Sequence, residues 1–232
     1  MNRSTLFFLV CFAGVAAGCA AGTDPNAADE SAESGDEAAQ AARVADPRTT
    51  LREMTFPLDA HAVSPALESF RDSGDHLVMD VPFAPVNAIA RTLNDALHVR
   101  LKDRGEAHVT VITPPEASAM RSKLSVRDMN AIATHLDIQH SDFEPLCVGV
   151  GVARSNRALQ TYFVVVASEN LFAIRREIQR EFVARGGSAR AFDANAFTPH
   201  VTIAFTQRDL FEQDGVAKTT SSCPNARNLR TE

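Results

Sequence analysis

Short apolar runs separated by polar, Gly and Pro residues divide residues 75–205 into segments of two kinds. Runs rich in branched apolar side chains predict strands over residues 75–81, 107–112, 143–153, 160–167 and 199–205. Apolar positions at three- and four-residue spacing predict helices over residues 86–99, 125–136 and 170–185. Because strands and helices do not alternate as regularly as in a doubly wound sheet, the pattern favours the α+β class.

Local signals mark the ends of several of these elements. Ser125, followed three residues later by Asp128, predicts the start of the second helix, and the Gly186-Gly187 pair predicts the end of the third. Pro114-Pro115 is expected to close the strand over 107–112, because neither proline can continue a ladder. The polar segment at residues 154–157 suits a hairpin between two strands.

The first nineteen residues differ from the rest of the chain. A charged start at Arg3 precedes an apolar run over residues 6–15, which is the layout of a secretory signal and is shorter than the roughly 20 residues that span a bilayer. The run ends in Ala16-Ala17-Gly18-Cys19, which resembles the lipobox of bacterial lipoproteins, although Leu usually stands where this chain has Ala16. We therefore predict a lipoprotein-type signal peptide over residues 1–18, lipidation of Cys19 and a membrane-anchored place in the bacterial cell envelope. An ordinary signal peptide, which would give a secreted or periplasmic soluble protein, is the alternative.

Charge is concentrated in one short segment. The chain has a formal net charge of −6, and residues 19–47 contain seven acidic side chains against one basic side chain. This segment has no aromatic residue and no helical stripe, so we predict a disordered acidic tether over residues 19–47 and a folded domain over residues 48–232. The domain is close to neutral, which argues against a stable complex with long nucleic acid and leaves a small phosphate-bearing ligand possible.

Two cysteines, Cys147 and Cys223, fall within the predicted domain. In an oxidising compartment they could form one disulfide between the C-terminal tail and the body of the domain. The sequence leaves this pairing open.

Two of the predicted strands carry nearly the same four residues, His108-Val109-Thr110-Val111 and His200-Val201-Thr202-Ile203. Residues two apart in a strand point to the same face, so each segment presents an imidazole beside a hydroxyl. A histidine that only fills a polar niche is the usual alternative, but it does not explain why Thr recurs at the same offset. Two imidazoles can act as base and acid on opposite sides of one phosphorus while two hydroxyls hold its oxygens.

Since each motif offers one metal ligand, and His135 with His140 forms no convincing metal pair, we predict no metal and no cofactor.

These paired motifs resemble the two-histidine (2H) phosphoesterase superfamily, which includes RNA 2′,3′-cyclic phosphodiesterases, the 2′-5′ RNA ligase-like proteins and cyclic nucleotide phosphodiesterases. The resemblance is closest to the Swiss Army Knife RNA repair-like subgroup. It rests on residues 106–116, Pro199-His200-Val201-Thr202-Ile203, Arg208-Asp209-Leu210 and Asp214-Gly215-Val216. The resemblance implies two pseudo-symmetric lobes, each a small mainly antiparallel sheet with helices outside, and an active site in the cleft between them.

The resemblance also implies an activity. We expect metal-independent hydrolysis of a 2′,3′-cyclic phosphate, or of a related nucleotide or RNA-end phosphodiester, with His108 and His200 as general acid and base and with Thr110 and Thr202 on the phosphate. His200 is our preferred base, although the sequence has no asymmetry that decides between the two. We expect the protein to be a monomer. A non-catalytic nucleotide-binding envelope lipoprotein of the same fold is the alternative from another functional class.

Further contacts to a small nucleotide or a short RNA end are expected from the C-terminal tail and from aromatic residues. The resemblance implies that the tail over residues 208–218 is ordered near the site, which makes Arg208 and Lys218 candidate phosphate or sugar contacts, with a surface role as the alternative. Tyr162, the only tyrosine, could stack on a base, as could Phe163 and Phe205. Aromatic residues in a Val-rich strand are more often part of a core.

Overall fold

The computed structural model describes residues 46–58 and 75–231. The chain divides into two units, residues 1–43 and 44–232, and the first unit lies wholly outside the described residues. The predicted signal peptide, Cys19 and the tether as far as residue 45 are therefore outside them as well. Helix α2 (Pro47–Glu53) starts the described domain, with the Asp46 side chain accepting a hydrogen bond from the Arg48 amide. Asp46 and Pro47, which we assigned to the tether from the sequence, thus belong to the first turn of a helix.

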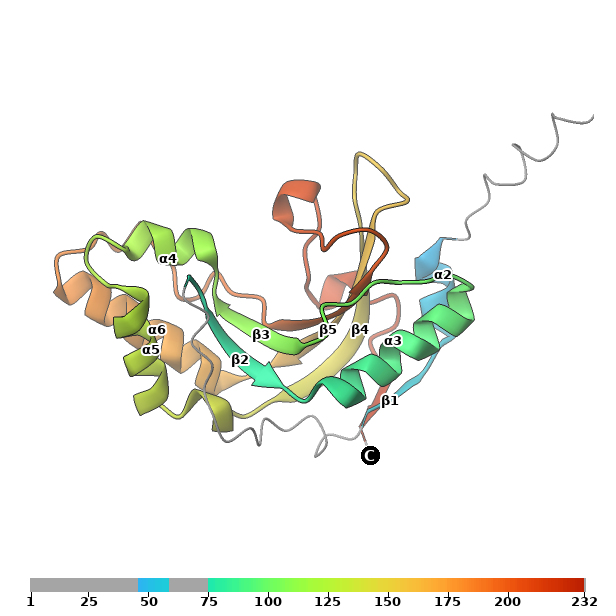
Figure 1. The fold of residues 1–232 in the computed structure, drawn as a ribbon, viewed down its shortest axis with the longest axis horizontal. Helices are drawn as coiled ribbons and strands as arrows, with labels where there is room; N and C mark the ends of the chain where they lie inside the picture. Colours follow the sequence, from blue (N-terminus) through green and yellow to red (C-terminus); the bar gives the residue numbers. More distant parts are fainter. Residues whose placement is uncertain (1–45, 59–74, 232) are drawn as a thin grey trace, which may run out of the picture. The chain divides into compact units, whose positions relative to one another are not determined.

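Five antiparallel strands form the central sheet in the order β2-β3-β6-β5-β4 (Figure 1). Their bounds are Leu77–Val81 for β2, Ala107–Ile112 for β3, Glu144–Val152 for β4, Gln160–Ala167 for β5 and His200–Phe205 for β6. Each of them falls within a segment predicted to be a strand. The antiparallel sheet with its helices confirms the α+β class.

The sheet contains the same unit twice. Helix α3 (Phe83–Leu97) connects β2 to its antiparallel neighbour β3, and helix α6 (Glu169–Ala184) connects β5 to its antiparallel neighbour β6. Strands β3 and β6 carry the two His-Val-Thr motifs. Each helix contacts the motif-bearing strand of the other unit, α3 against β6 and α6 against β3. Because β3 and β6 are themselves paired, the two lobes expected from the sequence are the two halves of one continuous sheet.

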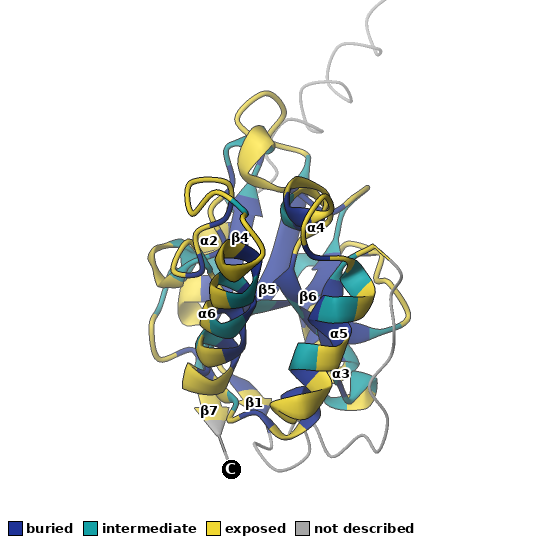
Figure 2. Ribbon diagram, turned by 90° about the vertical axis from the view of Figure 1, so that its left-hand side faces the viewer, coloured by how far each residue is buried: buried dark blue, intermediate teal, exposed yellow. Residues whose placement is uncertain are grey.

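The hydrophobic core lies between the helices and one face of this sheet. The apolar stripe expected on α3 is buried at Val86, Ile89, Ala90 and Leu93, and Leu97 is partly buried against it. Figure 2 shows buried residues along β4, β5 and β6 and exposed residues on the outer sides of the helices. Burying such side chains contributes about 1.5–3 kcal/mol each, so the helical stripe is a main source of the stability of the domain.

The helix ends show where the local signals were right and where they misled. Helix α5 (Val126–His135) begins with the expected Ser125 cap, and α6 ends directly before Arg185 and the Gly186-Gly187 pair. Pro114 and Pro115 close β3 as predicted but also begin helix α4 (Pro114–Met120), which the sequence reading missed. Proline suits the first turn of a helix, where its missing N–H would have no intrahelical partner. The Thr113 side chain and Glu116 complete a capping box there.

The ends of the domain are ordered against β4. Strand β1 (Phe56–Leu58) pairs in parallel with β7 (Leu229–Thr231), and the buried Asn228 side chain exchanges two hydrogen bonds with the Val148 backbone, at 2.9 and 2.8 Å. Among the described residues there are also three short 3-10 turns, η1 (Ile138–His140), η2 (Glu212–Asp214) and η3 (Thr220–Ser222). None of the helices in the described part of the chain is long and apolar enough to cross a membrane.

A disulfide joins Cys147 of β4 to Cys223 in the segment after β6, with 6.2 Å between the two Cα atoms. The pairing that the sequence left open is therefore formed. Val216, in the same segment, packs with Ala153 and Leu210 in a small apolar cluster. The disulfide and this cluster hold residues 206–223 against the β4–β5 hairpin.

Replacing both Cys147 and Cys223 with Ala should lower the free energy of unfolding by about 4 kcal/mol, because the bridge closes a long loop in the unfolded chain; its two cysteines are 76 residues apart. Urea denaturation of the variant and of the parent protein measures the difference. As a control, dithiothreitol should destabilise the parent and leave the variant unaffected. A denaturation midpoint that is the same in both proteins would contradict this expectation.

Candidate active site

The two His-x-Thr motifs lie side by side on neighbouring strands. Val109 of β3 pairs with Val201 of β6 in an antiparallel register, and both valines are buried. In that register His108 stands opposite Thr202, and His200 stands opposite Thr110. All four side chains are partly exposed and lie on the sheet face opposite the core helices. They form a square with the imidazoles on one diagonal and the hydroxyls on the other, which we call the His–Thr square.

Elements far apart in the sequence flank this face. Figure 1 shows α4 on one side of it, and the β4–β5 hairpin with the segment after β6 on the other. The square is therefore bordered by both halves of the chain, as the resemblance implied.

His200 is held in one orientation and kept neutral. Its Nδ1 lies 2.7 Å from the carbonyl oxygen of Thr198, and since a carbonyl can only accept, Nδ1 must carry the hydrogen and Nε2 must have the lone pair. The Phe163 ring meets the imidazole edge-on with 6.1 Å between centroids. Burial and the nearby Lys218 ammonium lower the pKa of His200 to about 4. At neutral pH this imidazole is therefore a proton acceptor.

The Phe163 ring reaches this position because β4 has no side chain beneath it. Gly149 pairs with Phe163, and a Cβ on Gly149 would lie 2.6 Å from an edge carbon of the ring. A side chain at 149 would therefore force the ring out of its position.

His108 has different surroundings. Its Nδ1 lies 3.4 Å from a carboxylate oxygen of Glu106, in ion-pair rather than hydrogen-bond geometry, and Asp80 of β2 stands opposite it in the sheet. Burial lowers the pKa of His108 and Arg104 adds to this effect, while Glu106 and Asp80 oppose it. One histidine of the square thus faces carboxylates and the other faces an ammonium group. This is the asymmetry that the sequence alone did not reveal.

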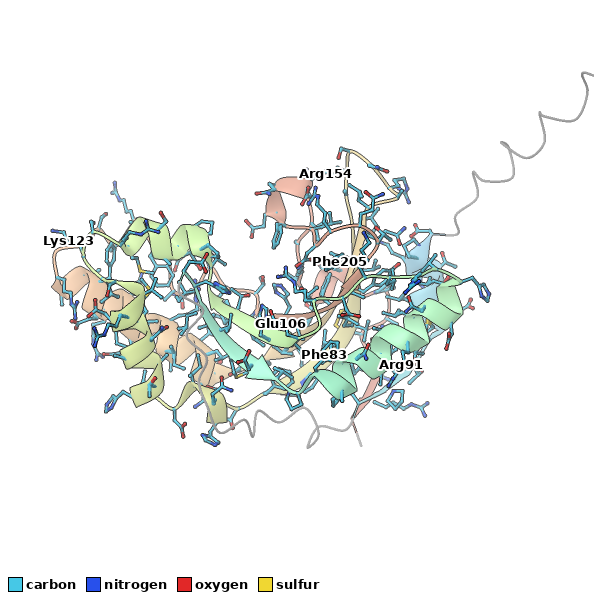
Figure 3. All side chains as sticks on the ribbon, viewed as in Figure 1. Phe83, Arg91, Glu106, Lys123, Arg154 and Phe205 are labelled. Atoms are coloured by element: carbon cyan, nitrogen blue, oxygen red, sulfur yellow. A yellow bond between two sulfur atoms is a disulfide. The ribbon has the colours of Figure 1, made fainter. Side chains whose placement is uncertain are left out.

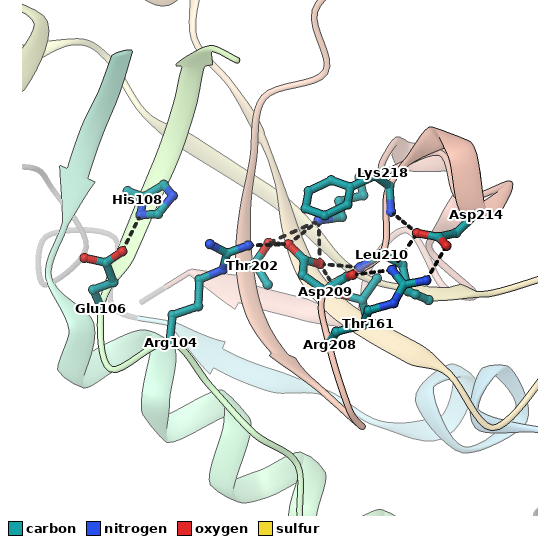
Figure 4. A network of polar contacts seen from close by, with 11 residues as sticks. Arg104, Glu106, His108, Thr161, Thr202, Arg208, Asp209, Leu210, Asp214 and Lys218 are labelled. Carbon is teal, nitrogen blue, oxygen red and sulfur yellow. Dashed lines mark hydrogen bonds and ion pairs between the residues drawn. The ribbon is translucent and has the colours of Figure 1, made fainter. Parts of the chain in front are cut away.

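A buried carboxylate connects the square to the segment after β6. Asp209 accepts hydrogen bonds from Thr161 at 2.6 Å, from Thr202 at 3.2 Å and from Arg104 at 3.0 Å, and Lys218 donates to both of its oxygens at 2.8 and 3.0 Å (Figure 4). Burial would raise the pKa of Asp209, but Lys218 and the other donors outweigh it and lower the pKa to about 2. Asp209 is therefore a permanent anion that fixes the position of Lys218.

Lys218 is the predicted contact that the structure brings to the motifs. Only 5% of its surface is exposed, and its Nζ also donates to the Thr202 hydroxyl at 3.2 Å. Burial lowers the pKa of Lys218, whereas Asp209 raises it. A cation fixed beside a motif hydroxyl is placed to attract a phosphoryl oxygen.

Two other candidate contacts are not at the square. Tyr162 is fully buried on the opposite face of β5, within the main core, and its hydroxyl donates to Gln160 at 2.6 Å. The alternation of side chains along β5 turns it away, so the prediction of a substrate contact was wrong. Arg208 binds both carboxylate oxygens of Asp214 and lies beside the square rather than on it. Its charge is used to hold the turn after β6 in place.

A buried arginine that the sequence reading missed supports both motifs from the core side. Arg175 of α6 is 1% exposed and lies between the rings of Phe192 and Phe197, 4.7 Å from each centroid. It donates to the Val111 carbonyl at the end of the first motif and to the Glu116 carboxylate of α4. It also donates to three carbonyls in the loop that leads to His200, those of Asp193, Ala194 and Ala196. An arginine in the middle of a helical pattern gives no sequence signal of such a role.

A further depression among the described residues lies away from the square. It has a volume of about 410 Å³, is open to solvent and lies between α5 and α6, where its charges pair with one another, as in the contacts of Arg185 with Asp128 and Glu181. Within residues 46–58 and 75–231, no three His, Cys, Asp or Glu side chains gather as a metal site would require.

The comparison with protein families agrees with this geometry. The family described as Swiss Army Knife, 2H phosphoesterase domain, matches residues 76–211, which is more than half of the chain and includes both motifs. The chain therefore belongs to the 2H phosphoesterase superfamily, in its Swiss Army Knife, RNA repair-like subgroup. This membership supports a hydrolase of the phosphodiesterase kind. Searches of curated proteins and of solved structures gave no match.

Proposed function

We propose that this protein hydrolyses 2′,3′-cyclic phosphates, or closely related nucleotide phosphodiesters, at the His–Thr square. The observation that carries the proposal is the pairing of β3 with β6, which puts two imidazoles and two hydroxyls at adjacent positions on one face of the sheet. In-line displacement at phosphorus requires a base on one side and an acid on the other, and the diagonal of the square supplies both.

The two histidines take unequal parts in this reaction. His200, neutral and with Nε2 free of the Thr198 contact, removes a proton from water as the water oxygen bonds to phosphorus. His108, beside the Glu106 carboxylate, gives its proton to the ribose oxygen as the P–O bond to that oxygen breaks. The product is a ribose monophosphate ester. Proton exchange with solvent then restores both imidazoles, so the cycle needs no metal ion or cofactor.

The phosphoryl oxygens are held by the other diagonal. Thr110 donates from its hydroxyl, and Thr202 does so by turning its hydroxyl hydrogen from Asp209 to the phosphate. Lys218 adds a positive charge next to Thr202. Because Asp209 fixes the ammonium before substrate binds, little reorganisation is needed when negative charge builds up on phosphorus. A small nucleotide or a short RNA end fits such a compact set of contacts better than a long polymer does.

We further propose that the protein acts in the bacterial cell envelope, anchored through lipidated Cys19. The proposal rests on the signal-like start, the Ala16-Ala17-Gly18-Cys19 segment and the acidic stretch that follows. The Cys147–Cys223 disulfide gives independent support, because structural disulfides persist in oxidising compartments. A role in degrading nucleotides outside the cytoplasm suits that location better than the repair of cellular RNA.

Replacing either His108 or His200 with Ala should reduce turnover of a 2′,3′-cyclic nucleotide about 10²- to 10⁴-fold, since each change removes one proton transfer. The rate of monophosphate formation by the purified variants measures the loss. His140→Ala is the matched control, because this imidazole is exposed and paired with Asp137 away from the square. A double His108→Ala, His200→Ala variant that works at the parent rate would refute the mechanism.

Activity should have a pH optimum on the acidic side of neutrality, with an acid limb near pH 4 where His200 becomes protonated. Lys218→Met removes a positive charge that lowers the pKa of His200, so the acid limb of kcat/KM should move to higher pH. NMR titration of the His200 ring should show the same shift. Lys123→Met is the control, since Lys123 is exposed and lies far from Glu106, the neighbour of His108 (Figure 3). A limb that stays in place, or moves to lower pH, would contradict the assignment of His200 as base.

Expression of the full chain in a bacterial host should yield a mature protein that begins with a lipid-modified Cys19. Mass spectrometry of the N-terminal peptide tests this directly. Cys19→Ser should leave the protein out of the membrane fraction while its purified activity is unchanged. A mature chain that starts at another residue, without lipid, would exclude the anchored form.

A further inference from the structure

An exposed aromatic ring lies next to the His–Thr square and takes no part in the mechanism above. Phe211 is 48% exposed and is the one aromatic residue among the large exposed hydrophobic residues of the described part of the chain; the others are Val99, Leu136 and Val183. A single exposed apolar side chain is common and by itself needs no explanation. The position of Phe211 beside the square, however, does need an explanation.

The Phe211 ring lies next to Lys218, which in turn contacts Thr202, one of the proposed phosphate ligands. The Lys218 Nζ lies 5.2 Å from the centroid of this ring and 3.2 Å from the Thr202 hydroxyl. An aromatic face, an ammonium group and a motif hydroxyl therefore follow one another over a span that one nucleoside phosphate can cover. The ammonium occupies one side of the ring, and about half of the side chain stays open to solvent.

The ring is carried by a rigid turn. The Phe211 amide donates to Asp214 at 2.9 Å, and Arg208 holds both oxygens of the same carboxylate. Gly215 closes the turn with a φ of +78°, a conformation that favours glycine, and a Cβ there would lie 2.5 Å from the Arg154 side chain. The backbone that carries Phe211 is thus held in place before any ligand binds, which lowers the entropy lost on stacking.

We propose that Phe211 stacks on the base of the substrate while the phosphate occupies the His–Thr square. This inference rests on the proposed function and makes it more specific, because it names a nucleoside 2′,3′-cyclic phosphate as the substrate class rather than a cyclic phosphate of a sugar alone. Every base has a π-face, so the contact favours nucleotides in general without selecting one base. It also assigns a purpose to the Arg208–Asp214 pair, which holds the stacking residue in place.

The test compares one substrate that has a base with one that lacks it. For adenosine 2′,3′-cyclic phosphate, Phe211→Ala should raise KM about 5- to 150-fold, which corresponds to about 1–3 kcal/mol of stacking. For methyl riboside 2′,3′-cyclic phosphate, the same variant should keep the parent kinetics. Phe211→Trp should keep or lower KM for the adenosine substrate, and Val99→Ala, an exposed apolar truncation elsewhere, should change neither.

Two kinetic outcomes would overturn the stacking proposal. Equal losses on both substrates would mean that Phe211 has only a structural role, and unchanged kinetics on both would mean that the base does not reach it.

If the parent protein hydrolyses neither substrate, the proposed function fails, and stacking is then decided by binding alone. Adenosine 3′-monophosphate and methyl riboside 3-phosphate are titrated into the parent and into Phe211→Ala by calorimetry. Weaker binding of the nucleotide alone to the variant supports the stacking contact. Equal affinities of parent and variant for the nucleotide exclude it.

Discussion

The antiparallel pairing of β3 with β6 is the contact on which the site depends. It joins two β-α-β units into one sheet and places two copies of a four-residue motif in register through Val109 and Val201. The register is enforced by burial, because a slip of one residue would turn these valines to solvent and the histidines into the core. The same apolar side chains that stabilise the fold therefore set the geometry of the His–Thr square.

Two networks of buried charged groups hold the surroundings of this pairing from opposite faces of the sheet. On the core side, Arg175 links the end of the first motif to the loop before the second, and its guanidinium is satisfied by carbonyls and by Glu116. On the open face, Asp209 and Lys218 tie the segment after β6 to Thr202. A buried charge costs several kcal/mol unless its hydrogen bonds are complete, so both networks persist only in the assembled fold. Each network links the His–Thr square to a segment that is remote from it along the chain.

The order of the strands and helices was largely predictable, because it follows from local periodicity. All five strands of the sheet and the helices α3, α5 and α6 were expected, with ends that differ by a few residues. The missed elements have physical reasons. Helix α4 begins with two prolines that also mark a strand end, and α2, β1 and β7 are short elements that are stable only because the two ends of the domain pack together against β4. Such short strands have too few residues to show a period of two.

By itself the sequence determined the four residues of the square and the family to which the chain belongs, because residues two apart in a strand must share a face wherever that strand lies. Only the tertiary structure decided which neighbours those residues acquired. In the folded protein Tyr162 is buried in the core and Arg208 binds Asp214. Lys218 contacts Thr202, and Phe211 is exposed to solvent beside Lys218. These contacts join segments that are remote along the chain, and they also create the unequal electrostatic surroundings of His108 and His200. The reason is that burial and charge proximity depend on packing in space, whereas the faces of a strand depend only on the local backbone.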